Sequence, residues 1–236
     1  MIVLATIITL FVLGSVIGWV IEVFFRRFFS IKKWINPGFL IGPYLPIYGI
    51  GVVFLYLLSN IDLSFLNIDL IWITIIRILT IGILMVIIEF IAGLIFIKGM
   101  RIKLWDYSKR KGNILGIICP LFSLIWLIVA CLYYFLINPF LVDFISLLVE
   151  TNNQIYFLFF GIIIGIIICD FCYSMHIATK IRKIAKEKKV VIYYAKLKAL
   201  ISSKHTHANK KPFFLTIVKN KDSIYDDVNS YTDIKD

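Results

Sequence analysis

The chain has 236 residues, of which 61% are hydrophobic, and it carries a formal net charge of +11. A soluble domain contains about 45–50% apolar residues, so this composition and the mean hydropathy of +0.93 exclude an ordinary soluble globular domain. The positive charges lie beside apolar segments, which favours anionic lipid headgroups over nucleic acid as their partner.

Five apolar stretches are long enough to cross a bilayer, which takes about 20 mostly apolar residues. They are residues 2–25, 39–58, 70–97, 114–137 and 155–178. The first stretch has neither the charged start nor the cleavage site of a signal peptide, so we expect it to be retained. The sequence therefore predicts an all-α integral membrane protein, with a bundle of five transmembrane helices in residues 1–179 and a basic cytoplasmic region in residues 180–236.

The segments between these stretches alternate in charge. The net charge is +4 in residues 25–38, −2 in 59–69, +5 in 98–113, −2 in 138–154 and +10 in 180–211. Positively charged segments stay in the cytoplasm. The alternation predicts an inner (plasma) membrane protein with its N-terminus outside and its C-terminus in the cytoplasm.

The basic region starts with residues 180–201, where lysine and arginine alternate with apolar residues at roughly helical spacing. This segment either continues the fifth helix or lies on the headgroups as an amphipathic helix. We expect the positive charges from Lys180 to Lys211 to bind anionic lipids, and the chain beyond Lys211 to be loosely ordered. Residues 139–149 are apolar enough to lie in the membrane interface.

Four charged side chains fall inside the apolar stretches: Glu22, Arg77, Glu89 and Asp170. Such residues are costly in lipid and are candidate functional residues. The three acids lie within about 6–15 Å of the cytoplasmic boundary. The alternative is that they pair with inner-loop cations or accept backbone hydrogen bonds, and for Glu22 the two interpretations are evenly balanced. Arg77 lies near the outer end, where we expect it to snorkel or to contact an outer loop.

Small residues recur on several helix faces and favour close packing. Because two of these faces carry Glu22 and Glu89, we expect both acids to point into the bundle. The small residues are Gly14 and Gly18 in the first stretch, Gly82 and Gly93 in the third, and Gly161 and Gly165 in the fifth.

Three prolines and three glycines open the second stretch, in residues 36–49, together with the candidate binding residues Asn36 and Tyr48. Proline removes backbone donors and glycine permits unusual dihedrals. The segment is therefore either unwound, with free carbonyls that coordinate a cation or a substrate amine, or a helix start with prolines in its first turns. We favour the unwound segment.

The loop before the fourth stretch supplies the remaining candidate binding residues, which are Trp105, Asp106, Tyr107 and Asn113. Aromatic residues also anchor at membrane interfaces, and aspartate caps turns, so for this motif taken alone the anchoring role is the better interpretation. No residue pattern indicates a particular cofactor or metal.

Several of these residues form an ordered set of motifs. The set is Gly18-Trp19-x-x-Glu22, Asn36-x-Gly38-Phe39-x-x-Gly42-Pro43-x-x-Pro46-x-Tyr48-Gly49, Glu89, Trp105-Asp106-Tyr107-Ser108, Asn113-x-x-Gly116, Trp126 and Pro139. It resembles a family of bacterial multi-pass membrane proteins known as CmpB-like or putative ABC-transporter type IV. The resemblance covers roughly residues 10–180, departs from the family pattern at Ile117, where an arginine is expected, and implies a transporter permease.

Three functions remain open. The first is the membrane subunit of a small-molecule or ion transporter. It would need a separate ABC ATPase, because the chain has no GxxxxGK[ST] motif, and a homo-oligomer or a second permease, because five spans are few. The second is an intramembrane enzyme acting on a lipid, although the sequence contains no metal-ligand or nucleophile motif that would support it. The third is a non-transporting membrane partner or regulator. We favour the first, with residues 98–113 as the ATPase-docking segment.

Overall fold

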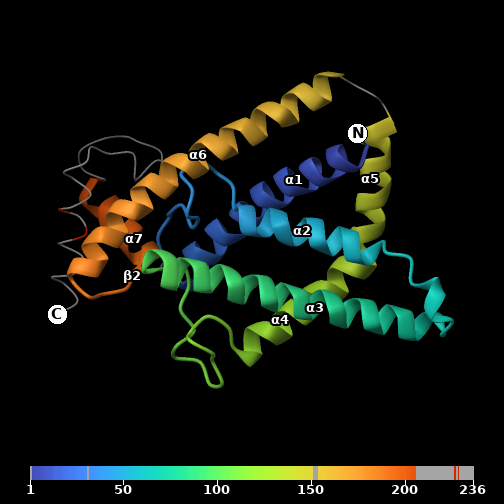
Figure 1. The fold of residues 1–236 in the computed structure, drawn as a ribbon, viewed down its shortest axis with the longest axis horizontal. Coiled ribbons are helices and arrows are strands. Elements are labelled where there is room, and N and C mark those ends of the chain that lie inside the picture. Colours follow the sequence, from blue (N-terminus) through green and yellow to red (C-terminus); the bar gives the residue numbers. More distant parts are fainter. Residues whose placement is uncertain (1, 31, 151–153, 206–225, 227, 229–236) are drawn as a thin grey trace. The chain divides into compact units, whose positions relative to one another are not determined.

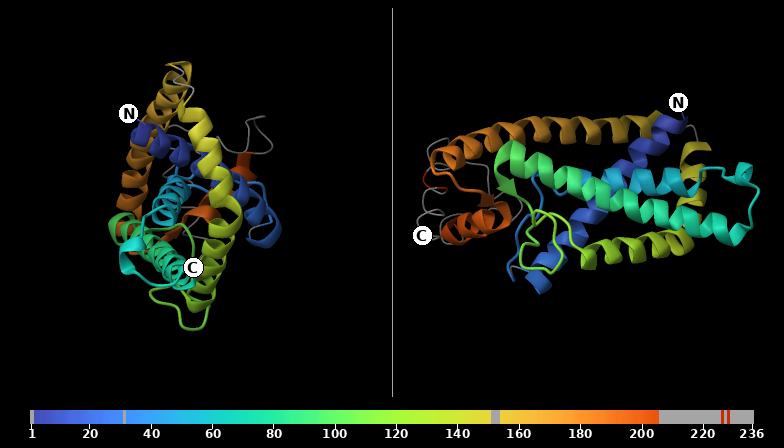
Figure 2. Two further views of the ribbon diagram at one scale, coloured as in Figure 1. Left: turned by 90° about the vertical axis from the view of Figure 1, so that its right-hand side faces the viewer. Right: turned by 60° about the horizontal axis from the view of Figure 1, so that its bottom comes forward.

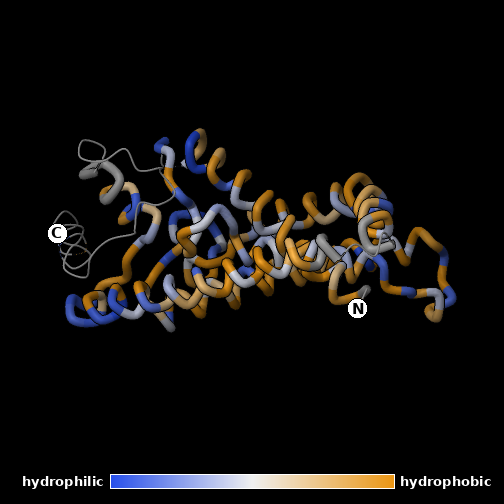
Figure 3. Tube along the Cα trace, turned by 90° about the horizontal axis from the view of Figure 1, so that it is seen from above, coloured by the Kyte–Doolittle hydropathy of each residue, from blue (hydrophilic) through white to orange (hydrophobic). Residues whose placement is uncertain are grey.

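The computed structural model describes residues 2–30, 32–150, 154–205, 226 and 228. Four helical stretches are long and apolar enough to cross a membrane, namely Val3–Ser30, Leu70–Gly99, Pro120–Leu147 and Leu158–Glu187. Apolar residues dominate along the helices, whereas hydrophilic residues gather at helix ends and in connecting segments (Figure 3). The prediction of an all-α membrane protein is confirmed.

The secondary structure is almost entirely helical (Figure 1). Helices α1, α3 and α4 each pass into a π-helical turn, and α5 continues directly from the turn after α4. In chain order the helices and strands are α1 (Ile2–Phe25, then the π turn Arg26–Ser30), α2 (Pro46–Ser59), a 3-10 helix (Ser64–Leu66), α3 (Leu70–Leu94, then the π turn Ile95–Gly99), β1 (Ile102–Lys103), α4 (Pro120–Leu132, then the π turn Tyr133–Ile137), α5 (Asn138–Glu150), α6 (Gln154–Glu187), β2 (Ile192–Tyr193) and α7 (Tyr194–His205).

Large apolar side chains are exposed along the long helices. On α3, Leu79, Ile83, Ile87 and Ile91 recur every four residues with exposed fractions between 46% and 61%. Residues four apart lie on one helix face, and soluble proteins rarely expose apolar patches of this extent. This face of α3 is therefore suited to contact with lipid.

The second apolar stretch differs from its prediction. Helix formation starts at Pro46 rather than near residue 39, which leaves α2 with 14 residues. At 1.5 Å per residue α2 is about 21 Å long, shorter than the hydrocarbon core of about 30 Å. A membrane crossing by α2 stays a prediction, as does the orientation of the termini.

The fourth helix begins six residues later than predicted. Leu115 and Gly116 have positive φ angles of 55° and 68°, a left-handed backbone conformation that a right-handed helix cannot include. Pro120 then occupies the first turn of α4, where its missing N–H costs no hydrogen bond. Residues 139–149, expected to lie as an apolar segment in the interface, are helical within α5.

The predicted basic helix over residues 180–201 is interrupted. Its first part continues α6 to Glu187, whereas Lys189 adopts a φ angle of 54° and β2 separates α6 from α7. The strand pair explains the break, because β2 hydrogen-bonds in parallel to β1. Helix α6 crosses the predicted boundary at residue 180 without interruption, and that boundary stays a prediction. The loose order expected beyond Lys211 concerns residues that lie outside the described part, apart from 226 and 228.

The chain divides into two compact units. Unit 1 contains Met1–Gly14, Pro46–Ala92 and Tyr107–Ile162, and unit 2 contains Ser15–Leu45, Gly93–Asp106 and Ile163–Asp236.

Unit 1 is held together by close helix packing around an apolar core. A Cβ atom on Gly14 of α1 would come within 2.8 Å of Val52 of α2, and one on Gly82 of α3 within 3.0 Å of Leu127 of α4. Figure 2 shows α3 and α4 packed against each other. The core residues are Leu55, Ile81, Met85, Ala130 and Tyr133.

The predicted packing strip on α6 has no facing helix among the described residues and stays a prediction. A Cβ atom built on Gly161 or Gly165 meets nothing within 4 Å, whereas Gly14 and Gly82 both lie against a neighbouring helix. The spacing of two glycines predicts that a close approach is sterically allowed, but a facing helix is also needed.

Unit 2 surrounds the segment that precedes α2. Helix α7 and strand β2 follow the C-terminal end of α6 (Figure 1). Ile35 packs with Ala195 and Ala199 of α7, and Ile102 of β1 and Ile192 of β2 are both completely buried. The described part of the tail up to His205 is therefore an integral part of this unit.

Candidate functional site

The segment that precedes α2 is unwound up to Leu45, as predicted, whereas Pro46 and Tyr48 lie in the first turn of α2, as the alternative of a helix start requires. Residues 33–45 form no helix, and Ile35 to Leu40 are all buried. Prolines 37 and 43 cannot donate backbone hydrogen bonds. Buried backbone groups outside regular structure need other partners, and unit 2 provides them from three directions.

Asp170 of α6 binds the backbone donors of this segment. One carboxylate oxygen, Oδ2, accepts hydrogen bonds from the backbone N–H of Gly42 and the hydroxyl of Tyr44, both at 2.7 Å. The N–H of Ile41 lies 3.1 Å from both carboxylate oxygens, and the Ser174 hydroxyl donates to Oδ1 at 2.9 Å. Hydrogen bonds to a charged acceptor are stronger than neutral ones, so Asp170 fastens the unwound segment to α6.

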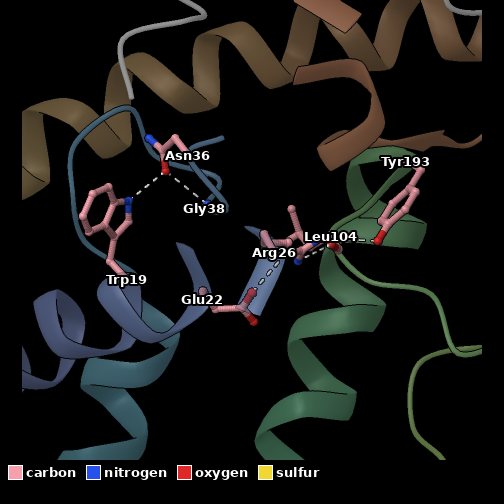
Figure 4. A network of polar contacts seen from close by, with 7 residues as sticks. All are labelled: Trp19, Glu22, Arg26, Asn36, Gly38, Leu104 and Tyr193. Carbon is pink, nitrogen blue, oxygen red and sulfur yellow. Dashed lines mark hydrogen bonds and ion pairs between the residues drawn. The ribbon is translucent and has the colours of Figure 1, made fainter. Parts of the chain in front are cut away.

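Asn36 stabilises the segment from within. Its Nδ2 donates to the carbonyls of Leu40 at 3.1 Å and Ile41 at 2.7 Å. Its Oδ1 accepts from the N–H of Gly38 at 3.2 Å and from the indole Nε1 of Trp19 at 3.1 Å (Figure 4). The 2% exposed side chain of Asn36 thus replaces helix hydrogen bonds with side-chain ones.

Helix α7 binds two further carbonyls of the segment. The Lys198 ammonium donates to the carbonyl of Gly38 at 2.6 Å, and the Tyr194 hydroxyl donates to that of Phe39 at 3.5 Å. The Lys198 Nζ also lies 4.8 Å from the centre of the Tyr194 ring. The predicted interaction of a freed carbonyl with an amine is thus made by the chain's own lysine.

Lys198 is a titratable group in an unusual environment. Its side chain is 3% exposed, and burial lowers the pKa of Lys198 to about 7. The negative charge of Asp170 opposes this shift, whereas the positive charge of Arg26 adds to it. Lys198 therefore changes its charge near neutral pH.

Glu22 pairs with a cation in unit 2. Its carboxylate binds Nε of Arg26 at 3.1 Å, and the same guanidinium donates to the Leu104 carbonyl at 3.2 Å and the Tyr193 hydroxyl at 3.3 Å (Figure 4). This pairing is one of the two balanced interpretations of Glu22 from the sequence. It links α1 to the loop after β1 and to β2.

Glu89 is bound by two neutral donors in unit 1. The hydroxyl of Tyr107 donates to Oε1 at 3.0 Å, and the indole Nε1 of Trp126 donates to Oε2 at 2.9 Å. Tyr107 also stacks on Phe122, with ring centres 4.2 Å apart. Glu89 is 7% exposed and ties the loop before α4 to both α3 and α4. The expectation that Glu22 and Glu89 both point into one bundle concerns both units and stays a prediction.

Arg77 contacts the segment between α2 and α3, as one of its predicted alternatives requires. Its guanidinium donates to the Ile61 carbonyl at 2.6 Å and to the Tyr134 hydroxyl at 3.0 Å. Its place is therefore at the end of α3 remote from Glu89.

The remaining predicted residues lie apart from Asp170. Asn113 folds the loop before α4, because it bonds to the carbonyls of Ser108 and Arg110 and accepts from the N–H of Gly116. Asp106 forms an ion pair with Lys103 at 3.2 Å. Trp105 and Tyr48 are both half-buried, and Tyr48 lies in the first turn of α2. The motif Trp105–Ser108 is divided between the units, with Tyr107 in unit 1.

Sequence reasoning missed several residues of these clusters. Arg26 was one of several inner-loop cations considered as partners of the acids, and Lys198 was one of eleven basic residues in the tail. Tyr44 lies between two prolines of the segment before α2, and Ser174 lies one helical turn after Asp170. Both positions could have suggested a side chain that hydrogen-bonds within this cluster. Nothing in the sequence distinguishes Lys198 from its neighbours.

These clusters offer hydrogen-bonding groups and charges that can bind a ligand. No group of three or more His, Cys, Asp or Glu side chains able to hold a metal occurs in the part of the chain that the structure describes. The unwound segment combines backbone carbonyls with a nearby carboxylate, a set that suits cations and amines. The functional role of each candidate residue stays a prediction.

Comparison with known proteins gives one match. A family described as putative ABC-transporter type IV matches residues 9–175. This range contains most of α1, all of α2 to α5, and most of α6 with Asp170, but not α7. No curated protein and no solved structure matches the chain. The match covers well over half of the sequence and confirms the resemblance inferred from the motifs. The chain belongs to the putative ABC-transporter type IV family.

Proposed function

We propose that this chain is the membrane subunit of a small-molecule or ion transporter in a bacterial plasma membrane, and that it works with a separate ATPase. The observation that carries the proposal is the buried unwound segment held by Asp170 of a candidate membrane helix. Transporters commonly place substrate sites where a membrane helix is interrupted, because freed backbone groups there face a ligand. The family description supports this function.

We assign the ATPase to a different chain, because these 236 residues contain no phosphate-binding GxxxxGK[ST] motif. Its docking site is proposed within residues 98–113. The most accessible part of this segment is the run Lys109, Arg110 and Lys111, all of which are exposed. A basic protruding loop suits a partner with an acidic surface.

The test is to purify the tagged full-length protein from its native host in mild detergent and to identify co-purifying proteins by mass spectrometry. We expect an ATPase at near-equal amount. The variant K109A/R110A/K111A should lose it. The matched control is R182A/K183A/K186A, which removes three exposed basic residues from the end of α6. A preparation without any ATPase would contradict the transporter proposal, and equal loss in both variants would contradict the docking site.

A second candidate, a non-transporting membrane partner, is favoured by one observation. Glu22, Glu89 and Asp170 each bind groups of the chain itself. The variants E22Q, E89Q and D170N separate the two functions. Normal amounts in the membrane with reduced ATPase activity of the complex would support a role in transport. Reduced amounts of all three variants would support structural roles and the second candidate.

A further inference from the structure

The carbonyl of Gly38 in the unwound segment has an unusual hydrogen-bond partner, a buried lysine. Gly38 is buried, and a Cβ atom added to it would meet the terminal methyl group of Leu45, which would have to shift. The oxygen accepts its hydrogen bond from Lys198, the side chain of a residue 160 positions later. A neutral hydroxyl or amide would satisfy the same carbonyl at lower cost, because a buried lysine is unfavourable.

The surroundings of the Lys198 nitrogen are those of an amine-binding site. The Gly38 carbonyl accepts an N–H at 2.6 Å, the Tyr194 ring lies 4.8 Å from the nitrogen, and the charge of Asp170 acts favourably on the protonated form. Carbonyl oxygens, aromatic faces and a carboxylate are the three groups by which proteins recognise a primary amine.

The unwound segment does not depend on Lys198 alone. The flexible four-carbon stem of Lys198 has many rotamers, and the segment keeps the hydrogen bonds from Asp170 and Asn36 when the lysine turns away. Lys196, two residues earlier on α7, is exposed. The same helix therefore carries both an exposed and a buried lysine.

We propose that the Gly38 carbonyl, the Tyr194 ring and Asp170 form a binding site for a small primary amine, and that Lys198 is the internal occupant that such an amine displaces. This inference deepens the proposed function and rests on it for one point, namely that the amine is the class of substrate transported. The site itself concerns unit 2 alone.

The first experiment uses the full-length protein in detergent with the variant K198A. n-Propylamine replaces the atoms that this substitution removes. We expect K198A to bind n-propylamine about tenfold more tightly than the wild type, in which Lys198 competes, by calorimetric titration. The variant K196A should behave as the wild type does. 1-Propanol and tetramethylammonium should not bind, because the first lacks the charge and the second lacks an N–H donor.

Two outcomes would overturn the proposal. Equal binding of n-propylamine and 1-propanol by K198A would reveal only a cavity, and equal affinity of K198A and the wild type would show that Lys198 does not occupy the site. K198M, which fills the space without an amine, should bind no propylamine.

A second measurement needs no variant and covers the case that K198A does not fold. Hydrogen exchange of the α7 amides in the wild type should accelerate at saturating n-propylamine and stay unchanged with tetramethylammonium, since displaced Lys198 no longer holds α7 to Gly38. Unchanged exchange with n-propylamine would overturn the proposal. Both measurements use the isolated chain, so their failure leaves the transporter proposal standing, and absence of an ATPase leaves the amine site standing.

Discussion

The guanidinium of Arg26 joins three parts of unit 2, because it binds Glu22 on α1, the Leu104 carbonyl after β1 and Tyr193 in β2. The side chain of Arg26 is 7% exposed and that of Glu22 is 21% exposed. At this burial a charge without its partner is costly. Position rather than residue type therefore makes this arginine structurally important, since Arg27 lies next to it and is less buried.

Replacing Glu22 tests this ion pair. E22Q keeps the size of the side chain and leaves Arg26 without its carboxylate, so we expect a loss of about 1–3 kcal/mol in unfolding free energy. Unfolding in detergent measures the loss. In a cycle with R26M, the double variant should be more stable than the sum of the two single effects indicates. Simple additivity would show that the pair contributes nothing.

The titration of Lys198 predicts that the stability of the folded protein depends on pH. Its pKa is about 7 in the folded protein and 10.5 in its ordinary state, so between these values the unfolded chain binds more protons than the folded one. The contribution of Lys198 to the free energy of unfolding therefore rises as pH increases from 7 to 10.5 and is constant below pH 7. The charges that act on it are Asp170 and Arg26. In thermal unfolding, the melting temperature of the wild type relative to that of K198M should rise between pH 6.5 and 9.5. A constant difference would contradict the assignment.

At the scale of elements, the close contact between α1 and α2 depends on a glycine. A methyl group at Gly14 would lie 2.8 Å from Val52 Cγ2 and 3.2 Å from the Cα of Gly49. We expect G14A to cost about 1–3 kcal/mol through overpacking, measured as unfolding free energy in detergent. G165A on α6 is the matched control, since it brings the same helix propensity change and its methyl group meets nothing within 4 Å. Equal stability of the two variants would show that α1 and α2 do not pack as described.

Elements also show where sequence reasoning reached its limit. The unwound segment before α2 followed from its prolines and glycines, whose effect on the backbone is local. The late start of α4 depends on the positive φ of Leu115, which no propensity of leucine predicts. The break between α6 and α7 depends on β2 pairing with Ile102, about 90 residues earlier, and such a pairing leaves no local signal.

For the whole molecule, the alternating loop charges predict that Lys33 and Ser64 lie on opposite sides of the membrane. Both residues are exposed in the structure. Single cysteines at these positions, in a variant without the four native cysteines, should react with a membrane-impermeant maleimide from the cytoplasmic side for K33C and from the outer side for S64C. Labelling from the same side would show that α2 does not span. S108C, which should label from the cytoplasm, is the control for orientation.

The sequence alone was sufficient for the class of the protein, its family and the position of the unwound segment, because hydropathy, motif order and proline content act locally along the chain. It also indicated Glu22, Glu89 and Asp170 as candidate residues, since charge inside an apolar stretch is visible in any sequence.

The tertiary structure decided which groups these acids bind, namely Arg26, Tyr107 with Trp126, and the backbone of Ile41 and Gly42. It also placed Lys198 on Gly38. Such partners are set by packing between distant segments, and a lysine in the tail differs from its neighbours only by the burial that folding imposes on it.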